Sequence, residues 1–283
     1  MEIPFIKMHG LGNNYVFVDT FEFNLEEEIL PALARKVSDV YTGIGSDGLI
    51  LIHPSDQAEV GMRIFNKDGS EGRNCGNGLR CVAKYAYDYG LVKDRSFTIE
   101  AKSGVVDASV TVEDKKVSSI TIDMGKPFLS RSQIPMAGEE KDQVVAESFQ
   151  VSHHPLELTA VSMGNPHAVF FVEDIHTAPL YELGPIITED RRFPEGINVE
   201  FVEVVSKKEL HFRVWERGSG VTQACGTGAC AAGVASVLNG YSDKNTEILV
   251  HLSGGDLVIR WDEDDRVWMT GPADIIATGT FYY

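Results

Sequence analysis

The sequence predicts an α+β fold of two pseudo-symmetric domains, each a mostly antiparallel β-sheet wrapped on a central α-helix. A short motif occurs once in each half, as CGNG at residues 75–78 and CGTG at residues 225–228, and the flanking residues align without a gap. Short β-branched and alternating runs, typical of strands, dominate both halves. An alanine-containing apolar segment follows each motif and ends at Gly90 or Gly240, as expected for a helix.

The individual elements follow from these patterns in chain order. Strands are expected in the first half at residues 15–19, 48–52, 61–65, 96–101, 105–112 and 116–124, with helices at about 25–38 and at 79–89. Strands are expected in the second half at residues 158–162, 168–172, 198–204, 209–215, 247–252, 256–261 and 266–270, with a helix at 229–238. A last strand at 273–281 lies beyond the second repeat, and we expect it to return to the first domain.

The domain boundaries are predicted from the repeat and from a polar segment between the halves. This segment begins with Met124-Gly125-Lys126-Pro127 and extends to Gln150, and it is expected to cross from one domain to the other. We therefore expect a first domain of residues 1–125 plus 271–283 and a second of residues 126–270. The active site is expected in the cleft between the two domains.

Composition excludes several classes of partner. The 283 residues include 42 acidic and 25 basic ones, which gives a formal net charge of −17. This charge would repel nucleic acid and anionic lipid, and no Lys/Arg cluster offsets it, so neither partner is expected. No apolar run approaches the ~20 residues of a membrane span, and residues 1–10 show no secretory signal. The expected location is therefore the cytoplasm.

The four cysteines are interpreted as free thiols. Cys75, Cys81, Cys225 and Cys230 lack the CxxC spacing and the paired histidines of common zinc sites, so no metal is expected. Cys81 and Cys230 fall inside the predicted helices and are assigned to packing. A single motif cysteine could also be a small buried hydrophobe, but packing does not require the identical glycine frame that Cys75 and Cys225 share.

A glycine-rich turn that opens a helix is suited to carboxylate binding, because the first backbone N–H groups have no intrahelical partner. A cysteine at the head of such a turn experiences the same field, which is expected to lower its thiol pKa from about 8.5 toward neutrality. Two such loops facing each other would place a thiolate and a thiol on opposite faces of one α-carbon. The helix N-termini would then stabilise carbanionic charge as it spreads into the carboxylate.

Several motifs together resemble one family, and the resemblance runs nearly end to end. HGLGNNYVFVD, GIGSDGLI, FNKDGSE, RNCGNGLRC, MGNPHAVFFV and ERGSGVTQACGTGAC are similar to segments of diaminopimelate epimerase. The resemblance implies a cofactor-independent, PLP-independent isomerase that interconverts LL- and meso-diaminopimelate by a two-base mechanism. It further implies a place in bacterial lysine and peptidoglycan-precursor biosynthesis, and a homodimer. By this resemblance Cys75 and Cys225 form the acid/base pair.

The resemblance also implies which residues bind the substrate. Gly76, Asn77, Gly226 and Thr227 are the loop positions that hold the reacting carboxylate, and the other contacts are Asn13, Asn66, Asn165, Asn198, Glu216 and Arg217. Side-chain amides and a guanidinium group suit the ammonium and carboxylate groups of a diamino diacid. His167 and Glu216 are implied to tune thiol ionisation. The chain departs from the family pattern at Gly48, Asn14 and Val221, where many relatives carry Gln, Asp and Glu.

Three alternatives stay open at this point. A proline or hydroxyproline racemase-like enzyme also uses paired thiols, although a monocarboxylate needs no such set of Asn and Arg contacts. A phenazine-pathway isomerase lacks the paired cysteines, and a catalytically silent diacid-binding relative has no need to keep both cysteine loops. A nicotinamide site is not expected, because the GxGxxG of residues 43–48 leads into an apparent strand rather than a helix.

Overall fold

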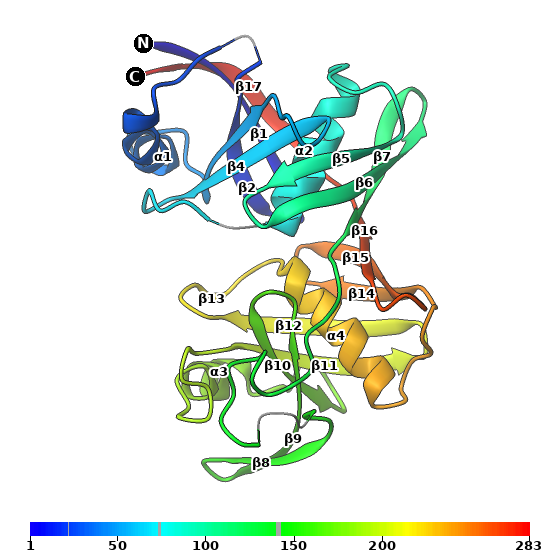
Figure 1. Cartoon of the computed structure of the whole chain (residues 1–283). Coiled ribbons are helices and arrows are strands. Elements are labelled where there is room, and N and C mark those ends of the chain that lie inside the picture. The colour runs from blue at the N-terminus through cyan, green and yellow to red at the C-terminus, as the bar shows by residue number, and fades with distance from the viewer. Residues whose placement is uncertain (22, 73–74, 140–142) are drawn as a thin grey trace. The chain divides into compact units, whose positions relative to one another are not determined.

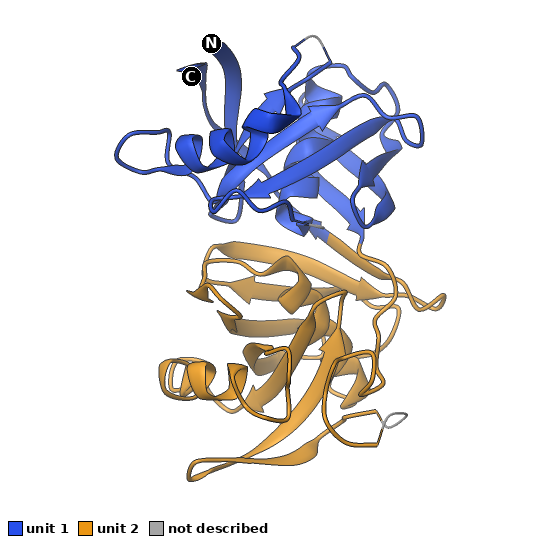
Figure 2. Cartoon of the chain, turned by 60° about the vertical axis from the view of Figure 1, so that its left-hand side comes forward, with its two compact units in different colours: residues 1–123, 270–283 blue, residues 124–269 orange. Residues whose placement is uncertain are grey.

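The computed structural model describes residues 1–21, 23–72, 75–139 and 143–283. These residues form two compact units, shown in Figures 1 and 2. Unit 1 comprises Met1–Asp123 and Thr270–Tyr283, and unit 2 comprises Met124–Met269. The expected domain boundaries at 125/126 and 270/271 stay a prediction, because compactness alone does not show that each unit folds independently.

Unit 1 is a mixed sheet with two α-helices and a short 3-10 helix, η1 (Glu27–Ile29). Its strands pair in the order β17–β1–β2–β3–β4–β5–β6–β7. The strands are β1 (Glu2–Gly10), β2 (Asn13–Asp19), β3 (Gly48–His53), β4 (Val60–Asn66), β5 (Ser96–Ala101), β6 (Gly104–Glu113), β7 (Lys116–Asp123) and β17 (Asp274–Tyr282), and the helices are α1 (Leu30–Ser38) and α2 (Gly76–Asp88).

Unit 2 repeats this arrangement with its own strands. Pairing runs in the order β8–β9–β10–β11–β12–β14–β15, and a two-residue strand, β13, also pairs with β12. The strands are β8 (Glu147–Val151), β9 (His154–Ser162), β10 (Pro166–Val172), β11 (Asn198–Ser206), β12 (Glu209–Glu216), β13 (Gly220–Val221), β14 (Ile248–Leu252) and β15 (Gly255–Trp261), and the helices are α3 (Leu180–Thr188) and α4 (Gly226–Leu238). Strand β16 (Val267–Gly271) begins in unit 2 and ends in unit 1.

The two units share their connections as well as their strand order. Most neighbouring strands are antiparallel, but β2–β3 and β4–β5 in unit 1 are parallel, as are β10–β11 and β12–β14 in unit 2. A parallel pair needs a crossover connection, and α1, α2, α3 and α4 each lie in one of these four crossovers. The predicted α+β fold of two pseudo-symmetric domains is confirmed, with parallel pairs where the helices cross.

The helix after each cysteine motif is the central element of its unit. Helix α2 packs on β1, β2, β4, β6 and β7, and α4 packs on β9, β10, β11, β14 and β15. Nearly every residue in α2 from Gly76 to Ala86 and in α4 from Gly226 to Ser236 is buried. Figure 1 shows α4 lying against the strands of its own unit. Helices α1 and α3 pack on separate core clusters, so each sheet is covered on both faces.

The structure corrects several sequence-based expectations. Residues 124–150 do not form a bare crossing segment: Ile134, Met136 and Val144 belong to the core of unit 2, and β8 lies at the end of the segment. Residues 140–142 of that segment lie outside the described residues. The strand β1 and the helix α3 were not predicted. Helices α2 and α4 begin at the motif glycines, earlier than expected.

The expected last strand and the expected helix ends are confirmed. The last strand, β17, pairs antiparallel with β1, with Ile3 opposite Phe281. Gly90 and Gly240 follow the last residues of α2 and α4 with φ of 76° and 74°, the left-handed conformation that favours glycine. The GxGxxG segment leads into β3, a strand. None of the helices in the described part of the chain is long and apolar enough to cross a membrane.

Candidate active site

The two motif cysteines occupy the same structural position in their units, directly before the central helix. Cys75 and Cys225 have extended backbone conformations and are the N-cap residues of α2 and α4. Each Sγ accepts a hydrogen bond, at 3.4 Å in both cases, from a backbone N–H of the first helical turn, that of Gly78 or Gly228. A thiol thus takes the role that a Ser or Asp oxygen usually fills at a helix N-terminus.

The second glycine of each motif is required by close packing. A Cβ on Gly78 would lie 2.7 Å from Cδ1 of Ile50. A Cβ on Gly228 would lie 3.0 Å from Oε1 of Glu200 and 3.2 Å from Sγ of Cys225. A side chain at either position would therefore displace groups that surround the thiol, which explains why both motifs carry glycine there.

In unit 1 an asparagine from β2 connects the cysteine loop to a half-buried carboxylate. The Cys75 Sγ lies 3.6 Å from Oδ1 of Asn13 and 3.8 Å from the hydroxyl of Tyr15. Oδ1 of Asn13 also accepts a hydrogen bond from Nδ2 of Asn77 at 3.0 Å. Its Nδ2 donates to Oδ2 of Asp47 at 2.9 Å. Asp47 therefore fixes the Asn13 amide with its oxygen toward the loop.

A buried arginine lies at the same end of α2. Arg80 is fully buried, and its Nη2 donates to Oδ1 of Asn77 at 2.9 Å. Its Nε donates to the carbonyl oxygen of Pro272 at 3.2 Å, so the returning C-terminal segment is bound to the helix beside the cysteine loop. The guanidinium is placed to hold the Asn77 side chain, one of the expected carboxylate-binding positions.

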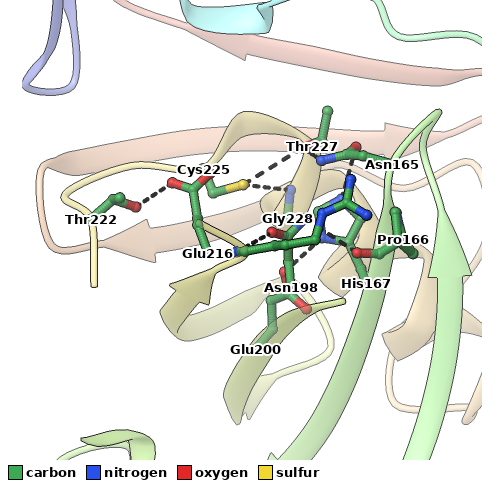
Figure 3. A network of polar contacts seen from close by, with 11 residues as sticks. Asn165, Pro166, His167, Asn198, Glu200, Glu216, Thr222, Cys225, Thr227 and Gly228 are labelled. Carbon is green, nitrogen blue, oxygen red and sulfur yellow. Dashed lines mark hydrogen bonds and ion pairs between the residues drawn. The ribbon is translucent and has the colours of Figure 1, made fainter. Parts of the chain in front are cut away.

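In unit 2 a longer chain of contacts begins at the second cysteine (Figure 3). Sγ of Cys225 lies 3.6 Å from Oγ1 of Thr227, which accepts a hydrogen bond from Nδ2 of Asn165 at 3.2 Å. Oδ1 of Asn165 lies 3.1 Å from Nε2 of His167. Nδ1 of His167 lies 2.6 Å from Oε1 of Glu200, and both of these side chains are fully buried.

A second group in unit 2 positions the arginine. The backbone N–H of Arg217 donates to Oδ1 of Asn198 at 2.8 Å, and Nδ2 of Asn198 donates to the carbonyl oxygen of Pro166 at 3.2 Å. The guanidinium of Arg217 donates one hydrogen bond, from Nη1 to the carbonyl oxygen of Glu195. Asn198 therefore connects the turn after β12, which carries Arg217, to the turn that carries Asn165.

The electrostatics of the two thiols differ from expectation. Burial raises the pKa of the Cys75 thiol, although the Gly78 N–H, Tyr15 and Arg80 favour the thiolate. Burial raises the pKa of Cys225 well above its usual value, and the charges of Glu216 and Glu200 raise it further. The prediction that the helix N-terminus lowers both thiol pKa values is wrong here, because loss of hydration outweighs the hydrogen bonds that favour each thiolate.

Two other predicted residues form hydrogen bonds outside these networks, although the charge of Glu216 acts on Cys225. Nδ2 of Asn66 donates to Oγ of Ser70 within its own turn, at 3.0 Å, and Glu216 accepts a hydrogen bond from the Thr222 hydroxyl. At Gly48, a Cβ would lie 2.1 Å from the Phe65 carbonyl oxygen, so the backbone here leaves no room for a side chain.

Sequence reasoning assigned no role to the side chains of five residues that join these networks, which are Tyr15, Asp47, Arg80, Glu200 and Thr222. A usable signal exists for Glu200, because a charged residue within the apolar run Val199-Glu200-Phe201-Val202 is unexpected in a buried strand. All four cysteines are free thiols. Across residues 1–21, 23–72, 75–139 and 143–283, no group of three or more His, Cys, Asp or Glu side chains is placed to hold a metal ion.

Comparison with known sequences connects this arrangement to one family. A sequence model of the family described as diaminopimelate epimerase matches residues 5–129 and 159–276, one stretch in each half of the chain. The chain is 67% identical over 279 residues to the diaminopimelate epimerase of Geobacillus thermodenitrificans strain NG80-2, which covers 99% of this chain and 96% of that protein.

Comparison with solved structures shows a more widely shared fold. A phenazine biosynthesis protein of the PhzF family from Bacillus anthracis matches with a TM-score of 0.74 at 18% identity, over 100% of both chains. A probable proline racemase from Agrobacterium radiobacter K84 matches with a TM-score of 0.69 at 15% identity, over 99% of this chain and 93% of the other. At such identities the likeness concerns the fold alone.

Proposed function

The chain belongs to the diaminopimelate epimerase family, and from this premise we propose that Cys75 and Cys225 are the two bases that invert one α-carbon of diaminopimelate. The enzyme is an isomerase, and its sequence relatives are named for this reaction. The observation that carries the proposal is the shared N-cap geometry, in which both thiols accept a helical N–H at 3.4 Å. Two thiols in equivalent positions suit a reversible inversion, because each can act as the base in one direction and as the acid in the other.

In the proposed reaction one cysteine is a thiolate and the other a thiol. The thiolate removes the α-proton, so an S–H bond forms as the C–H bond breaks and the electron pair spreads into the substrate carboxylate. The second thiol returns a proton to the opposite face and becomes the thiolate. Backbone N–H groups at Gly76, Asn77, Gly226 and Thr227 hold the carboxylate as its charge increases.

Burial of the thiols supports this chemistry. A thiolate that is poorly hydrated and has a raised pKa is a stronger base than an ordinary cysteine, and α-protons of amino acids are weakly acidic. The substrate must then favour the thiolate form on binding, and its ammonium group is the charge available to do so. No cofactor is needed in this scheme.

The distal half of the substrate provides specificity. We assign its contacts to Asn66, Asn165, Asn198 and Arg217, with Glu216 available for an ammonium group. Recognition of two amino-acid heads would explain inversion of LL- to meso-diaminopimelate, which serves lysine and peptidoglycan-precursor biosynthesis.

Proton exchange in heavy water tests the two-base mechanism. Early product should carry deuterium at the inverted carbon while unreacted substrate gains little, because each face has its own base. Cys75→Ala and Cys225→Ala should abolish inversion. Cys81→Ala and Cys230→Ala are the matched controls in the same helices and should keep it. Equal early labelling of substrate and product would indicate a single base and contradict the proposal.

Substrate range separates this function from the related alternatives. The enzyme should act on LL- and meso-diaminopimelate and leave DD-diaminopimelate, lysine and proline essentially untouched. Turnover of proline at a comparable rate would instead support a proline racemase-like activity, and binding of diaminopimelate without inversion would indicate a silent binding protein.

We also propose that the enzyme is a homodimer. Strand β17 pairs with β1 on one side, and Ile275, Ile276 and Tyr282 on it are 41%, 49% and 72% exposed. A long, apolar strand with exposed faces is a ready surface for a second copy. Sedimentation equilibrium should give twice the mass of one chain, and Tyr282→Glu should shift it toward the monomer. A wild-type monomer at micromolar concentration would refute the dimer.

A further inference from the structure

Glu200 is a carboxyl group in an environment that ordinarily excludes one. It lies in β11 and is fully buried. Its Oε1 contacts Nδ1 of His167 at 2.6 Å, whereas its Oε2 is buried and makes no hydrogen bond to any residue that the structure describes. Burial of a carboxyl group is unfavourable unless a partner compensates it, so the contact with His167 accounts for its presence in this strand.

The hydrogen bonds around His167 determine how many protons the pair holds. Asn165 directs Nδ2 toward Thr227, so the Asn165 atom that faces His167 is Oδ1, which can only accept. Nε2 of His167 must therefore carry a hydrogen. A second proton must lie between Nδ1 and Oε1, because two bare lone pairs would repel each other at 2.6 Å. The pair thus carries no net charge, as imidazolium with carboxylate or as imidazole with carboxylic acid.

We propose that Glu200 is a positioning residue for the Cys225 half of the site. Together with His167 it retains the proton between Nδ1 and Oε1, so that Nε2 of His167 also keeps its hydrogen. That hydrogen fixes the Asn165 amide with its NH2 group toward Thr227 and the cysteine loop. The inference rests on the proposed function, because Asn165 and Cys225 are assigned there to substrate binding and proton transfer. Without the second proton, His167 would either lack a hydrogen on Nε2 or lose its hydrogen bond to Glu200. In the first case Nε2 and Oδ1 of Asn165 would both be acceptors, and the Asn165 amide would rotate.

The other repeat supports this assignment independently. In unit 1 a carboxylate, Asp47, contacts the equivalent asparagine directly: Asn13 directs Nδ2 toward Asp47 and Oδ1 toward Asn77 of the loop. In unit 2 the His167 imidazole lies between the Glu200 carboxyl group and the Asn165 amide. Here the amide directs Nδ2, rather than Oδ1, toward the loop. Both repeats therefore use a carboxyl group to orient an asparagine beside the cysteine loop, and His167 determines which end of the amide faces the loop.

Glu200 also lies against the cysteine loop itself. Its Oε1 is 3.0 Å from the position that a Cβ of Gly228 would occupy. The other titratable groups that interact with this pair are Glu216 and the Cys225 thiol. A pair that keeps its proton disfavours the Cys225 thiolate less than an uncompensated carboxylate would, so the thiolate forms more readily during turnover.

Nitrogen-15 NMR of the histidine ring, combined with steady-state kinetics, tests the assignment. In the wild type, Nε2 of His167 should carry a hydrogen, as its contact with Oδ1 of Asn165 at 3.1 Å requires. Glu200→Leu should give His167 a mixed or reversed tautomer and lower kcat/KM roughly ten- to hundredfold. Glu200→Gln can donate to Nδ1, so it should keep Nε2 protonated and hold kcat/KM within about threefold of wild type.

Glu203→Gln is the matched control, because Glu203 lies on the same strand and contacts a different histidine, His211, at 3.4 Å. It should leave the His167 signals and kcat/KM unchanged. A wild-type His167 with unprotonated Nε2 would overturn the assignment, and so would Glu200→Leu with wild-type tautomer or wild-type kcat/KM. If Glu200→Leu does not fold, the wild-type NMR spectrum and the kinetics and spectrum of Glu200→Gln still test the assignment. A wild type without epimerase activity would refute the proposed function, while the NMR test of Glu200 stays valid.

Discussion

At the scale of single residues, the two cysteines show how neighbours differentiate sites that the sequence makes equivalent. Both sulfurs accept the same N–H bond at the same distance, and burial raises both thiol pKa values. Arg80 then favours the thiolate of Cys75, whereas Glu216 and Glu200 disfavour that of Cys225. The repeat therefore determines where the thiols lie, and residues outside the motif determine how readily each ionises.

Glu216→Gln should lower the pKa of the Cys225 thiol. Burial is the largest cause of the raised pKa, and the Glu216 charge is the next. Removing that charge leaves the effect of burial, so the pKa of Cys225 stays raised but by a smaller amount. More thiolate is then present at a given pH. The rate of Cys225 alkylation, followed by peptide mapping against pH, should reach its midpoint at a lower pH than in the wild type.

Thr222→Val provides the control for that measurement. It removes the hydroxyl that donates to the Glu216 carboxylate but leaves the charge in place, so the Cys225 profile should shift far less than in Glu216→Gln. An unchanged profile in Glu216→Gln would show that the carboxylate does not act on the thiol.

Arg217→Lys should impair the enzyme while leaving the thiols intact. The variant keeps the positive charge but loses the planar fork that can bind a carboxylate through two bonds, and it also loses the contact to the Glu195 carbonyl. Loss of a bidentate, charge-assisted contact to the substrate carboxylate should lower kcat/KM about tenfold or more. Steady-state kinetics with LL-diaminopimelate measures this, and a wild-type value would remove Arg217 from the substrate site.

At the scale of elements, the two ends of α4 place different demands on glycine. Gly228 in the first turn faces Glu200, Phe212 and the Cys225 sulfur, each within 3.2 Å of the position that a Cβ would occupy, whereas a Cβ on Gly240 meets nothing within 4 Å. Gly228→Ala should therefore displace the cysteine loop and lower kcat/KM about tenfold or more. Gly240→Ala should leave activity unchanged and cost about 1 kcal/mol of stability, because φ is +74° there. Equal activity of the two variants, measured beside thermal unfolding, would contradict this account.

The elements that sequence patterns predict best are those with a strong local signal. The helices after each motif combine apolar periodicity with a terminal glycine, and the last strand is uninterrupted, so both were predicted. Helix α3 was missed because Gly184 and Pro185 interrupt it, and the structure shows why glycine is needed: a Cβ there would lie 2.8 Å from the Trp215 side chain. Strand β8 was missed because its residues are largely polar and it follows an irregular stretch.

The residues of the candidate site, like the elements, could be predicted only where the sequence carries a local signal. The duplicated motif and the resemblance identified Cys75, Cys225 and the surrounding asparagines, and the structure brings Asn13 to one loop and Asn165 to the other. Glu200 was missed because its partner His167 is distant in sequence, and no local pattern indicates which strand will bring a carboxyl group under a loop. Arg80 was missed although Asn77 lies one helical turn away, because its contact with the Pro272 carbonyl depends on the returning C-terminal segment. The predicted direction of the thiol pKa shifts was wrong, because the burial that raises these pKa values depends on the packing of the whole unit.

At the scale of the whole molecule, the two units are built from the chain in different ways. Unit 2 is continuous, from Met124 to Met269, and has a core cluster that extends from Ile134 to Phe201. Unit 1 is discontinuous, because its strand β17 comes from the end of the chain and pairs with β1 along nearly its full length. Repeats of the same strand order can therefore differ in whether they are able to fold as one segment.

A fragment of residues 124–269 should fold by itself. It retains all strand pairs from β8 to β15, and the entry and exit segments remain joined through the Met124 and Val267 backbones, with an N–H to carbonyl distance of 2.8 Å. Its length is within the usual range of an independent domain. Circular dichroism during heating should show one cooperative transition, and a gradual, non-cooperative change would mean that unit 2 depends on the rest of the chain.

Residues 1–123 should behave differently. Without β17, strand β1 loses one of its two neighbours and exposes an unpaired edge in which Ile3 and Met8 are normally buried, so this fragment should aggregate or unfold. Joining residues 270–283 to it through a flexible glycine–serine linker restores the pairing and should restore a cooperative transition. If residues 1–123 fold as well without β17 as with it, the returning strand is dispensable for unit 1, and the discontinuity of this unit reflects the path of the chain rather than a requirement for stability.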